Sequence, residues 1–111
     1  MEITFSSAKV EKLLAIESAR VRALGPEAPR LVYRRMVQLH AASDLAAMAT
    51  LPGRCHELAG DRAGQLAVEV TKGLRLVFKP TDQPPPVKPD GGLDWSAVTA
   101  ITILEVTDYH G

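Results

Sequence analysis

The chain has 111 residues, which is the length of one domain. Its 13 basic and 13 acidic side chains give a formal net charge of +0. This balance argues against a generic nucleic-acid-binding protein, because such proteins usually carry a basic excess. A hydrophobic content of 46% is typical of a folded chain and excludes intrinsic disorder. We therefore expect a single globular domain over residues 1–111.

The compartment is predicted from the cysteine content and from apolar runs. Cys55 is the single cysteine, so no internal disulfide can form, and a reduced cytoplasmic setting is expected. No apolar run is long enough for a transmembrane helix, and the first residues lack the pattern of a signal peptide. We expect no membrane partner.

The neutral total hides an uneven distribution of charge along the chain. Residues 1–80 carry 12 basic and 8 acidic side chains, whereas residues 81–111 carry 1 basic and 5 acidic side chains. This asymmetry either reflects chance variation along a mixed surface or indicates a basic body with a separate acidic segment.

The chain is expected to open with a short strand and a helix. Residues 2–5 alternate in polarity, which places Ile3 and Phe5 on one face of a strand. Ser6 or Ser7 is suited to cap the helix that follows, because a serine oxygen accepts a hydrogen bond from a first-turn N–H group. The apolar positions with helical spacing after this cap are Val10, Leu13, Leu14, Val21 and Leu24.

A second helix is expected after Gly25, with Pro26 in its first turn. The apolar positions predicted for its buried side are Val32, Met36 and Leu39. The arginines predicted for its mainly solvated side are Arg30, Arg34 and Arg35. Asp44 is suited to cap a short third helix that ends near residues 51–53.

The second half of the chain changes to the period of strands. Residues 66–71 alternate in polarity, and a turn at residues 72–73 leads into an apolar strand over residues 74–78. Residues 80–92 are rich in proline and glycine and predict an exposed loop. A final strand is expected from residue 97 or 98 to Thr107. This order predicts an α+β fold, an antiparallel meander with helices on one side.

The end of the last strand carries three proton-handling residues in a row. These are Asp108, Tyr109 and His110, and strand alternation predicts Asp108 and His110 on one face with Tyr109 on the other. Such groups at a strand end are suited to acid–base chemistry. The alternative interpretation is a frayed polar tail.

A second polar cluster, at residues 54–62, precedes the meander. His56 is suited to hold a proton or a phosphate and Arg62 to hold a phosphate, although a solvated loop histidine is the alternative. Arg75 lies inside an apolar strand, where an isolated guanidinium would be costly. It is therefore expected either to pair with a carboxylate or to line a groove that binds phosphate.

Metal and cysteine chemistry are poor interpretations of this sequence. His40, His56 and His110 are far apart, and no Cys/His pair has the spacing of zinc ligands, so no metal or other cofactor is expected. Cys55 neighbours His56, but adjacent side chains rarely face each other, and no oxyanion arrangement is recognisable nearby.

Four segments in this order resemble HigB-type toxins of the RelE/ParE superfamily, whose longer members are described as plasmid-maintenance or "killer" proteins. The segments are Leu51–Pro52–Gly53, His56–Glu57–Leu58 with Gly60–Asp61–Arg62, Leu74–Arg75–Leu76–Val77–Phe78, and Ile103 to His110. The resemblance covers residues 51–111 well, apart from the proline-rich loop. It implies a RelE-like fold, with a small antiparallel sheet and N-terminal helices packed on one face.

The resemblance also implies a metal-independent, ribosome-dependent mRNA endonuclease. In such enzymes the substrate's 2′-hydroxyl attacks the adjacent phosphate and leaves a 2′,3′-cyclic phosphate. By position, His56 and His110 become the acid–base pair, with the two roles left open, while Asp108 orients a histidine and Tyr109 stacks on a base or donates to the phosphate. Arg75, and Arg62 more weakly, would offset the charge on the phosphate.

The implied partners are mRNA on the ribosome and an antitoxin, typically a helix-turn-helix DNA-binding protein, in a possible heterotetramer. Ala59 stands where many relatives have lysine, and the aromatic residue that often precedes the strand arginine is absent. Two alternatives stay open, the first because the fold is shared and the second because of the departure at Ala59. One is a ParE-like toxin that inhibits DNA gyrase, and the other is an inactive RelE-like protein-binding module.

Overall fold

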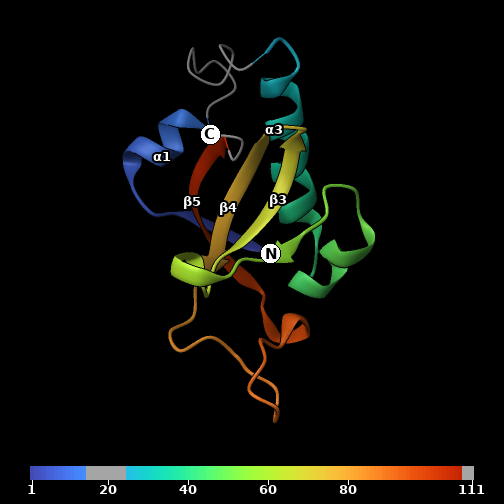
Figure 1. Cartoon of the computed structure of the whole chain (residues 1–111), viewed down its shortest axis with the longest axis vertical. Coiled ribbons are helices and arrows are strands. Elements are labelled where there is room, and N and C mark those ends of the chain that lie inside the picture. The colour runs from blue at the N-terminus through green and yellow to red at the C-terminus, as the bar shows by residue number, and fades with distance from the viewer. Residues whose placement is uncertain (15–24, 109–111) are drawn as a thin grey trace.

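A five-stranded sheet forms the centre of the computed structural model, which describes residues 1–14 and 25–108 (Figure 1). The strands are β1 (Glu2–Phe5), β2 (His56–Glu57), β3 (Leu66–Thr71), β4 (Leu74–Pro80) and β5 (Ala100–Asp108). The α-helices are α1 (Ala8–Leu13) and α3 (Ala28–Ala41), and the 3₁₀ helices are η1 (Leu45–Thr50), η2 (Gly60–Arg62) and η3 (Trp95–Ala97). No helix in these two segments is long and apolar enough to cross a membrane.

The strand order is β1–β5–β4–β3–β2. The pairs β5–β4, β4–β3 and β3–β2 are antiparallel, whereas β1 lies parallel to β5. The first strand of the chain therefore stands beside the last one, and Glu2 lies opposite Ala100. This arrangement confirms the predicted α+β fold with a small, mostly antiparallel sheet.

The main core lies between the sheet and helix α3, which passes behind the sheet in Figure 1. Alternate residues of each long strand face this core because successive side chains of a strand point to opposite sides. The strand residues buried in the core cluster are Leu66, Val68, Val70, Leu74, Leu76, Phe78, Ile101, Ile103 and Val106. Helix α3 contributes Val32 and Leu39, as its spacing predicted, and Met36 is partly buried.

Two predicted helix caps are confirmed. The Ser7 Oγ atom accepts a hydrogen bond from the Val10 backbone N–H at 3.2 Å, and Asp44 Oδ1 accepts one from Ala47 at 3.1 Å. Asp44 caps a 3₁₀ helix, η1. The predicted continuation of the first helix to Leu24 lies outside the described residues.

The start of α3 corrects the prediction for Pro26. That residue lies in a turn before the helix, which begins at Ala28 after the N-cap residue Glu27. Pro29 occupies the first turn instead. A proline is tolerated there because the first N–H groups of a helix have no partner within it.

Arg35 is the clearest departure from the predicted helix faces. It was expected on the solvated side of α3, but its side chain is buried with only 9% exposed. Its Nε atom donates to the Glu69 backbone carbonyl at 2.7 Å, and its Nη1 atom donates to Gln38 Oε1 at 3.0 Å. Burial lowers the pKa of the Arg35 guanidinium from its ordinary value. These two acceptors are what allow a charged group to lie here.

The last strand begins later than expected, at Ala100. Residues 95–97 form η3 instead, because the Ala97 N–H bonds to the Asp94 carbonyl at 3.0 Å and the Val98 N–H to the Trp95 carbonyl at 3.3 Å. The predicted loop begins one residue later than expected, since Pro80 is the last residue of β4. Residues 81–84 and 87–92 are exposed, as their composition predicted.

Candidate functional site

The candidate site lies on the outer face of the sheet, defined here as the face opposite α1 and α3. The residues of this face alternate with those of the core. They are His56, Ala67, Glu69, Arg75, Val77, Glu105 and Thr107. Figure 1 shows η2 in front of the lower end of the sheet, on the side away from α3.

The strand registers arrange these residues in two rows. The first row runs from His56 on β2 through Ala67 and Val77 to Glu105 on β5. Because residues directly opposite each other in a ladder share a face, the members of a row are neighbours. The second row, two residues further along the strands, consists of Glu69, Arg75 and Thr107.

His56 has one ring nitrogen committed to the backbone and an exposed side chain. Its Nδ1 atom lies 2.7 Å from the Arg54 carbonyl oxygen. A carbonyl oxygen only accepts hydrogen bonds, so Nδ1 carries the proton, and in the neutral ring the lone pair is on Nε2. Arg54 has a positive φ of 49°, which is uncommon for a residue other than glycine. This local geometry prepares His56 to accept a proton at Nε2.

Arg62 reaches across the sheet from the connection between β2 and β3. Its Nη2 atom lies 2.8 Å from Glu105 Oε1, and its Nη1 atom donates to Gln65 Oε1 at 3.0 Å. Ala67 and Val77 lie between His56 and Glu105 in the first row and are fully buried, although they belong to the outer face. Arg62 thus holds η2 over the first row and has two of its nitrogens engaged.

Arg75 lies in the second row, on the central part of the outer face. Its partners in register are Glu69 on β3 and Thr107 on β5. The neighbouring pair joins Leu74 to Asp108, and Leu74 belongs to the core, so strand alternation places position 108 on the core face, opposite to the face of Arg75. Tyr109 and His110 lie outside the described residues.

The strand order separates His56 from the end of β5 and leaves Arg75 between them. With about 4.8 Å between strands and 3.3 Å between residues, the Cα atoms of His56 and Arg75 are roughly 12 Å apart. The same spacings put the Cα atoms of His56 and Asp108 roughly 17 Å apart. His56 on β2 and position 108 on β5 therefore lie on opposite sides of the strand that carries Arg75.

Glu69 belongs to the same surface and was missed as a functional residue. Its Oε1 atom is 3.5 Å from the Arg54 Nη1 atom, and it lies directly opposite Arg75. A symmetric hairpin about residues 72–73 would place Val70 opposite Arg75, and the register shift between Glu69 and Thr71 is what brings Glu69 there instead. Local spacing therefore does not reveal this pair, because strand register decides which residues face each other.

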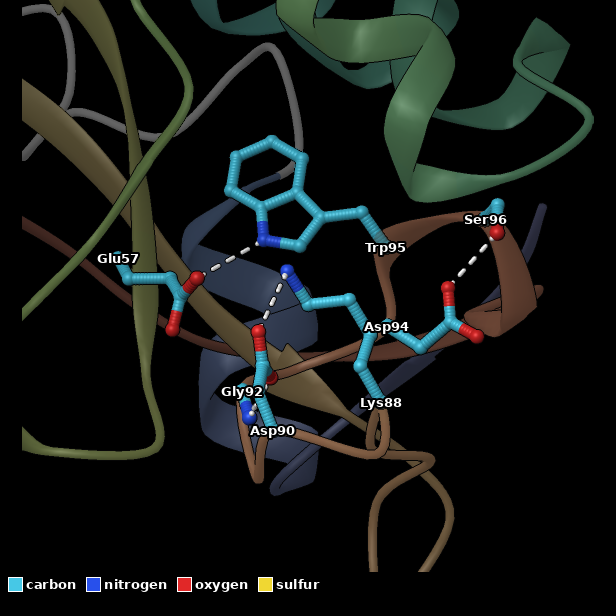
Figure 2. A network of polar contacts seen from close by, with 7 residues as sticks. All are labelled: Glu57, Lys88, Asp90, Gly92, Asp94, Trp95 and Ser96. Atoms are coloured by element: carbon cyan, nitrogen blue, oxygen red, sulfur yellow. Dashed lines mark hydrogen bonds and ion pairs between the residues drawn. The ribbon is translucent and has the colours of Figure 1, made fainter.

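The short helix η3, which follows the proline-rich loop, is tied to strand β2 next to His56. Figure 2 shows the Trp95 indole directed at Glu57, and its Nε1 atom donates to Glu57 Oε2 at 2.9 Å. Within the loop, the Gly92 N–H donates to Asp90 Oδ1 at 2.8 Å and Lys88 Nζ lies 3.8 Å from Asp90 Oδ2. Trp95, which is far along the chain from Glu57, thus supports β2, a strand of only two residues.

Cys55 does not have the properties of a nucleophile. Burial raises the pKa of its thiol from 9.0 to about 12, so the reactive thiolate is scarce at neutral pH.

No group of three or more His, Cys, Asp or Glu side chains within residues 1–14 and 25–108 is arranged to hold a metal ion.

A separate apolar groove lies between β1 and α3, on the core side of the sheet. It is lined by Ile3, Phe5, Met36, Val37 and His40. Val37 is 47% exposed, and Tyr33, one turn earlier on α3, is 54% exposed. Exposed apolar side chains beside a groove are typical of surfaces that bind other proteins.

Comparisons with known proteins identify the fold. No protein-family model matches the sequence, and no curated protein matches it either. Among solved structures, a chain of the YoeB–YefM complex from Staphylococcus aureus matches with a TM-score of 0.56 over 100% of this chain and 98% of that one, at 14% identity. A YoeB/ParE toxin from Agrobacterium tumefaciens matches with a TM-score of 0.55 over 98% and 99% of the two chains, also at 14% identity.

The chain has the fold of these toxins. Both matches span nearly the whole of each chain, so the likeness includes the helices as well as the sheet. This agrees with the RelE/ParE fold that the sequence resemblance implied. At 14% identity, the likeness concerns the fold, and the activity has to be argued from the site.

Proposed function

We propose that the chain is the toxin of a toxin–antitoxin pair and acts as a metal-independent, ribosome-dependent mRNA endonuclease of the HigB type. The fold shared with the YoeB–YefM complex and with the YoeB/ParE toxin supports the toxin assignment. The outer face supports the nuclease assignment, because it combines a prepared histidine with arginines.

The position of Arg75 between His56 and the end of β5 carries this proposal. In an in-line displacement at phosphorus, the attacking and leaving oxygens are on opposite sides of the phosphate. A base and an acid must therefore come from opposite sides, with positive charge between them. Strand β4 carries Arg75, with β2 and His56 on one side of it and β5 on the other. We propose that His110, which follows β5 in the sequence, supplies the second group.

The geometry of His56 favours it as the base. Its Nε2 atom takes the proton of the 2′-hydroxyl, the 2′-oxygen forms a bond to phosphorus, and the bond from phosphorus to the 5′-oxygen breaks. His110 gives its proton to the departing 5′-oxygen. The products are a 2′,3′-cyclic phosphate and a 5′-hydroxyl. Arg75 offsets the charge that develops on the phosphate during this exchange.

Asp108 and Tyr109 are assigned to the proposed site on the resemblance alone, since the pairing with Leu74 places position 108 on the core face of β5. Asp108 orients a histidine, and Tyr109 stacks on a base or donates to the phosphate. Arg62 acts mainly through its contact with Glu105, which holds η2 over the first row, and is a secondary phosphate ligand.

The experiment measures cleavage of mRNA on purified translating ribosomes and growth arrest after induction without antitoxin. Loss of a general acid or base typically lowers the rate by about 10²- to 10⁴-fold, so we expect losses of this size for His56→Ala, Arg75→Ala and His110→Ala. His40→Ala, on α3, is the matched control and should retain full activity. Unchanged cleavage by His56→Ala and by a double His110→Ala, Arg75→Ala variant would exclude the proposed site.

We also propose an antitoxin as partner, seated in part on the apolar groove between β1 and α3. The YoeB–YefM complex supports a partner for this fold, and exposed Tyr33 and Val37 support an apolar contact. Val37→Lys should weaken antitoxin binding by at least tenfold in calorimetry without changing mRNA cleavage. Equal affinity of Val37→Lys and the native chain would contradict this location.

A gyrase-inhibiting toxin is the second candidate, because one of the matched structures is a YoeB/ParE toxin. A supercoiling assay with purified gyrase separates the two functions. Inhibition at stoichiometric toxin, unaffected by His56→Ala, would favour the gyrase inhibitor over the nuclease.

A further inference from the structure

Three arginines on or beside the outer face each stand next to a carboxylate of the same chain. Arg62 Nη2 lies 2.8 Å from Glu105 Oε1, and Arg54 Nη1 lies 3.5 Å from Glu69 Oε1. Arg75 is directly opposite Glu69 in the ladder. Two of these arginines are thus paired with a carboxylate and the third has one opposite it in the ladder, so carboxylates of the chain offset the charge of groups suited to bind an RNA backbone.

Glu69 is held in this position by its backbone. Its N–H donates to the Gly53 carbonyl at 2.6 Å, and its carbonyl accepts from the buried Arg35 Nε atom at 2.7 Å. With both backbone groups fixed, the side chain stays on the outer face, where it is 30% exposed. The Glu69 carboxylate lies 3.5 Å from Arg54, and the Glu69 backbone stands opposite Arg75 in the ladder.

Glu105 lies on β5, which is on the other side of β4 from Glu69. It follows the irregular pairing between β4 and β5 and lies opposite Val77 in the first row. Its side chain is 40% exposed and that of Arg62 is 34% exposed, so the pair is accessible to a competing anion. The two carboxylates thus stand on β3 and β5, on either side of the strand that carries Arg75.

We propose that Glu69 and Glu105 are internal competitors for substrate phosphates, which keep the outer face from binding free single-stranded RNA. This inference rests on the proposed function, since it takes RNA as the ligand of this face. An arginine binds a carboxylate and a phosphate with the same planar arrangement of donors, so a phosphate has to displace the carboxylate. Each displacement removes part of the gain that RNA obtains from counterion release.

This competition makes the affinity depend on how the RNA is presented. A flexible free strand gains little by exchanging carboxylates for phosphates one at a time. A strand already held in position by another particle brings its phosphates together at the face, so less ordering cost remains. The carboxylates thereby select presented RNA over free RNA.

The test compares Glu69→Gln and Glu105→Gln with the native chain. Glutamine keeps the side-chain size and an acceptor oxygen but removes the charge. The probe is a fluorescein-labelled 2′-O-methyl RNA of 20 nucleotides, which lacks the attacking hydroxyl, followed by fluorescence anisotropy from 50 to 300 mM salt. Glu11→Gln, an exposed position on α1, is the matched control for the change in net charge.

We expect Glu69→Gln to tighten RNA binding by about tenfold at the lowest salt and to steepen the salt dependence by about 0.7 in log–log slope, the value for one further phosphate contact. Glu105→Gln should act in the same direction, and Glu11→Gln should change the affinity by less than about threefold. Thermal melting identifies any variant that is unfolded, and Glu69→Gln and Glu105→Gln test the inference independently.

The inference is wrong if neither folded variant binds RNA more tightly than Glu11→Gln. Its failure is distinguishable from failure of the proposed function. Cleavage by the native chain without a gain in binding would overturn the competition and leave the nuclease. A gain in binding without any cleavage would support the competition and overturn the nuclease.

Discussion

The buried Arg35 on α3 donates its Nε hydrogen to the backbone carbonyl of Glu69 on β3 at 2.7 Å. The contact lies where the pairing of β3 with β4 is irregular, between Glu69 and Thr71. Strand β2 pairs with β3 only at Leu66 and Ala67, and at Glu69 the backbone N–H bonds to the Gly53 carbonyl instead. A loop carbonyl and a helix side chain thus supply the hydrogen bonds of Glu69 beyond the end of β2.

Removing this donor should destabilise the fold. Arg35→Met keeps much of the side-chain volume but leaves the Glu69 carbonyl without its donor, at a cost of about 2 kcal/mol in the free energy of unfolding. Urea denaturation measures the difference. The neighbouring Arg34 is exposed, and Arg34→Met should cost less than about 0.5 kcal/mol. Equal losses for the two variants would contradict the role given to Arg35.

Gly53 should be the least replaceable glycine in the described segments. Its φ is +108°, and an added Cβ would lie 2.5 Å from Val68 Cγ2 and 2.9 Å from Arg35 Nε. Gly53→Ala should therefore lower the free energy of unfolding by about 3 kcal/mol, because both backbone strain and overpacking contribute. Gly60, with φ of +67° and open space around its Cβ position, is the control. Gly60→Ala should cost only about 1 kcal/mol, from backbone strain alone.

The Arg62–Glu105 pair should contribute a measurable coupling energy. Both side chains are partly exposed, so solvent screens the pair, and we expect about 1 kcal/mol from a double-mutant cycle of Arg62→Ala and Glu105→Ala. The coupling should fall as salt is added. Additive losses at low salt would show that the contact has no energetic role.

The free energy of unfolding should depend on pH through Cys55, and the raised pKa gives the direction of this dependence. The thiol pKa is about 12 in the folded state and 9.0 as its ordinary value, so above pH 9 the unfolded state binds fewer protons than the folded state. The free energy of unfolding should therefore decrease between pH 9 and pH 12, and Cys55→Ala should flatten this decrease. Urea titrations at several pH values measure it. The same variant should keep its cleavage activity, because Cys55 is no nucleophile.

Iodoacetamide provides a second measurement on the same residue. Alkylation requires the thiolate, so the folded protein at pH 8 should react at least about a hundredfold more slowly than the protein in urea. Equal rates in the two states would contradict the raised pKa.

The regular elements could be predicted because their signals are local. The alternation of residues 66–71 and 74–78 marks β3 and β4, and Ser7 and Asp44 cap the helices that their positions indicated. The proline content of residues 80–92 predicted an exposed loop. Each of these patterns is completed within a few residues, so no knowledge of distant contacts is needed.

The function of particular side chains depended on contacts between distant parts of the chain. Arg35 has a position on the helix that spacing assigned to solvent, but the carbonyl of Glu69 lies within its reach. Arg62 was predicted as a phosphate ligand, and its main contact is Glu105, 43 residues later. Local spacing contains no information on such pairs.

The sequence by itself determined the α+β class, the positions of the strands, the helix caps and the choice of His56 and Arg75 as candidate residues. Only the tertiary structure decided that β1 lies beside β5, that Arg75 stands between His56 and the end of the last strand, and that Glu69 and Glu105 neutralise the outer face. Part of the balance between basic and acidic side chains therefore takes the form of contacts on one surface of the sheet. The physical reason is that periodicity fixes which way a side chain points, whereas strand order and register fix what it meets.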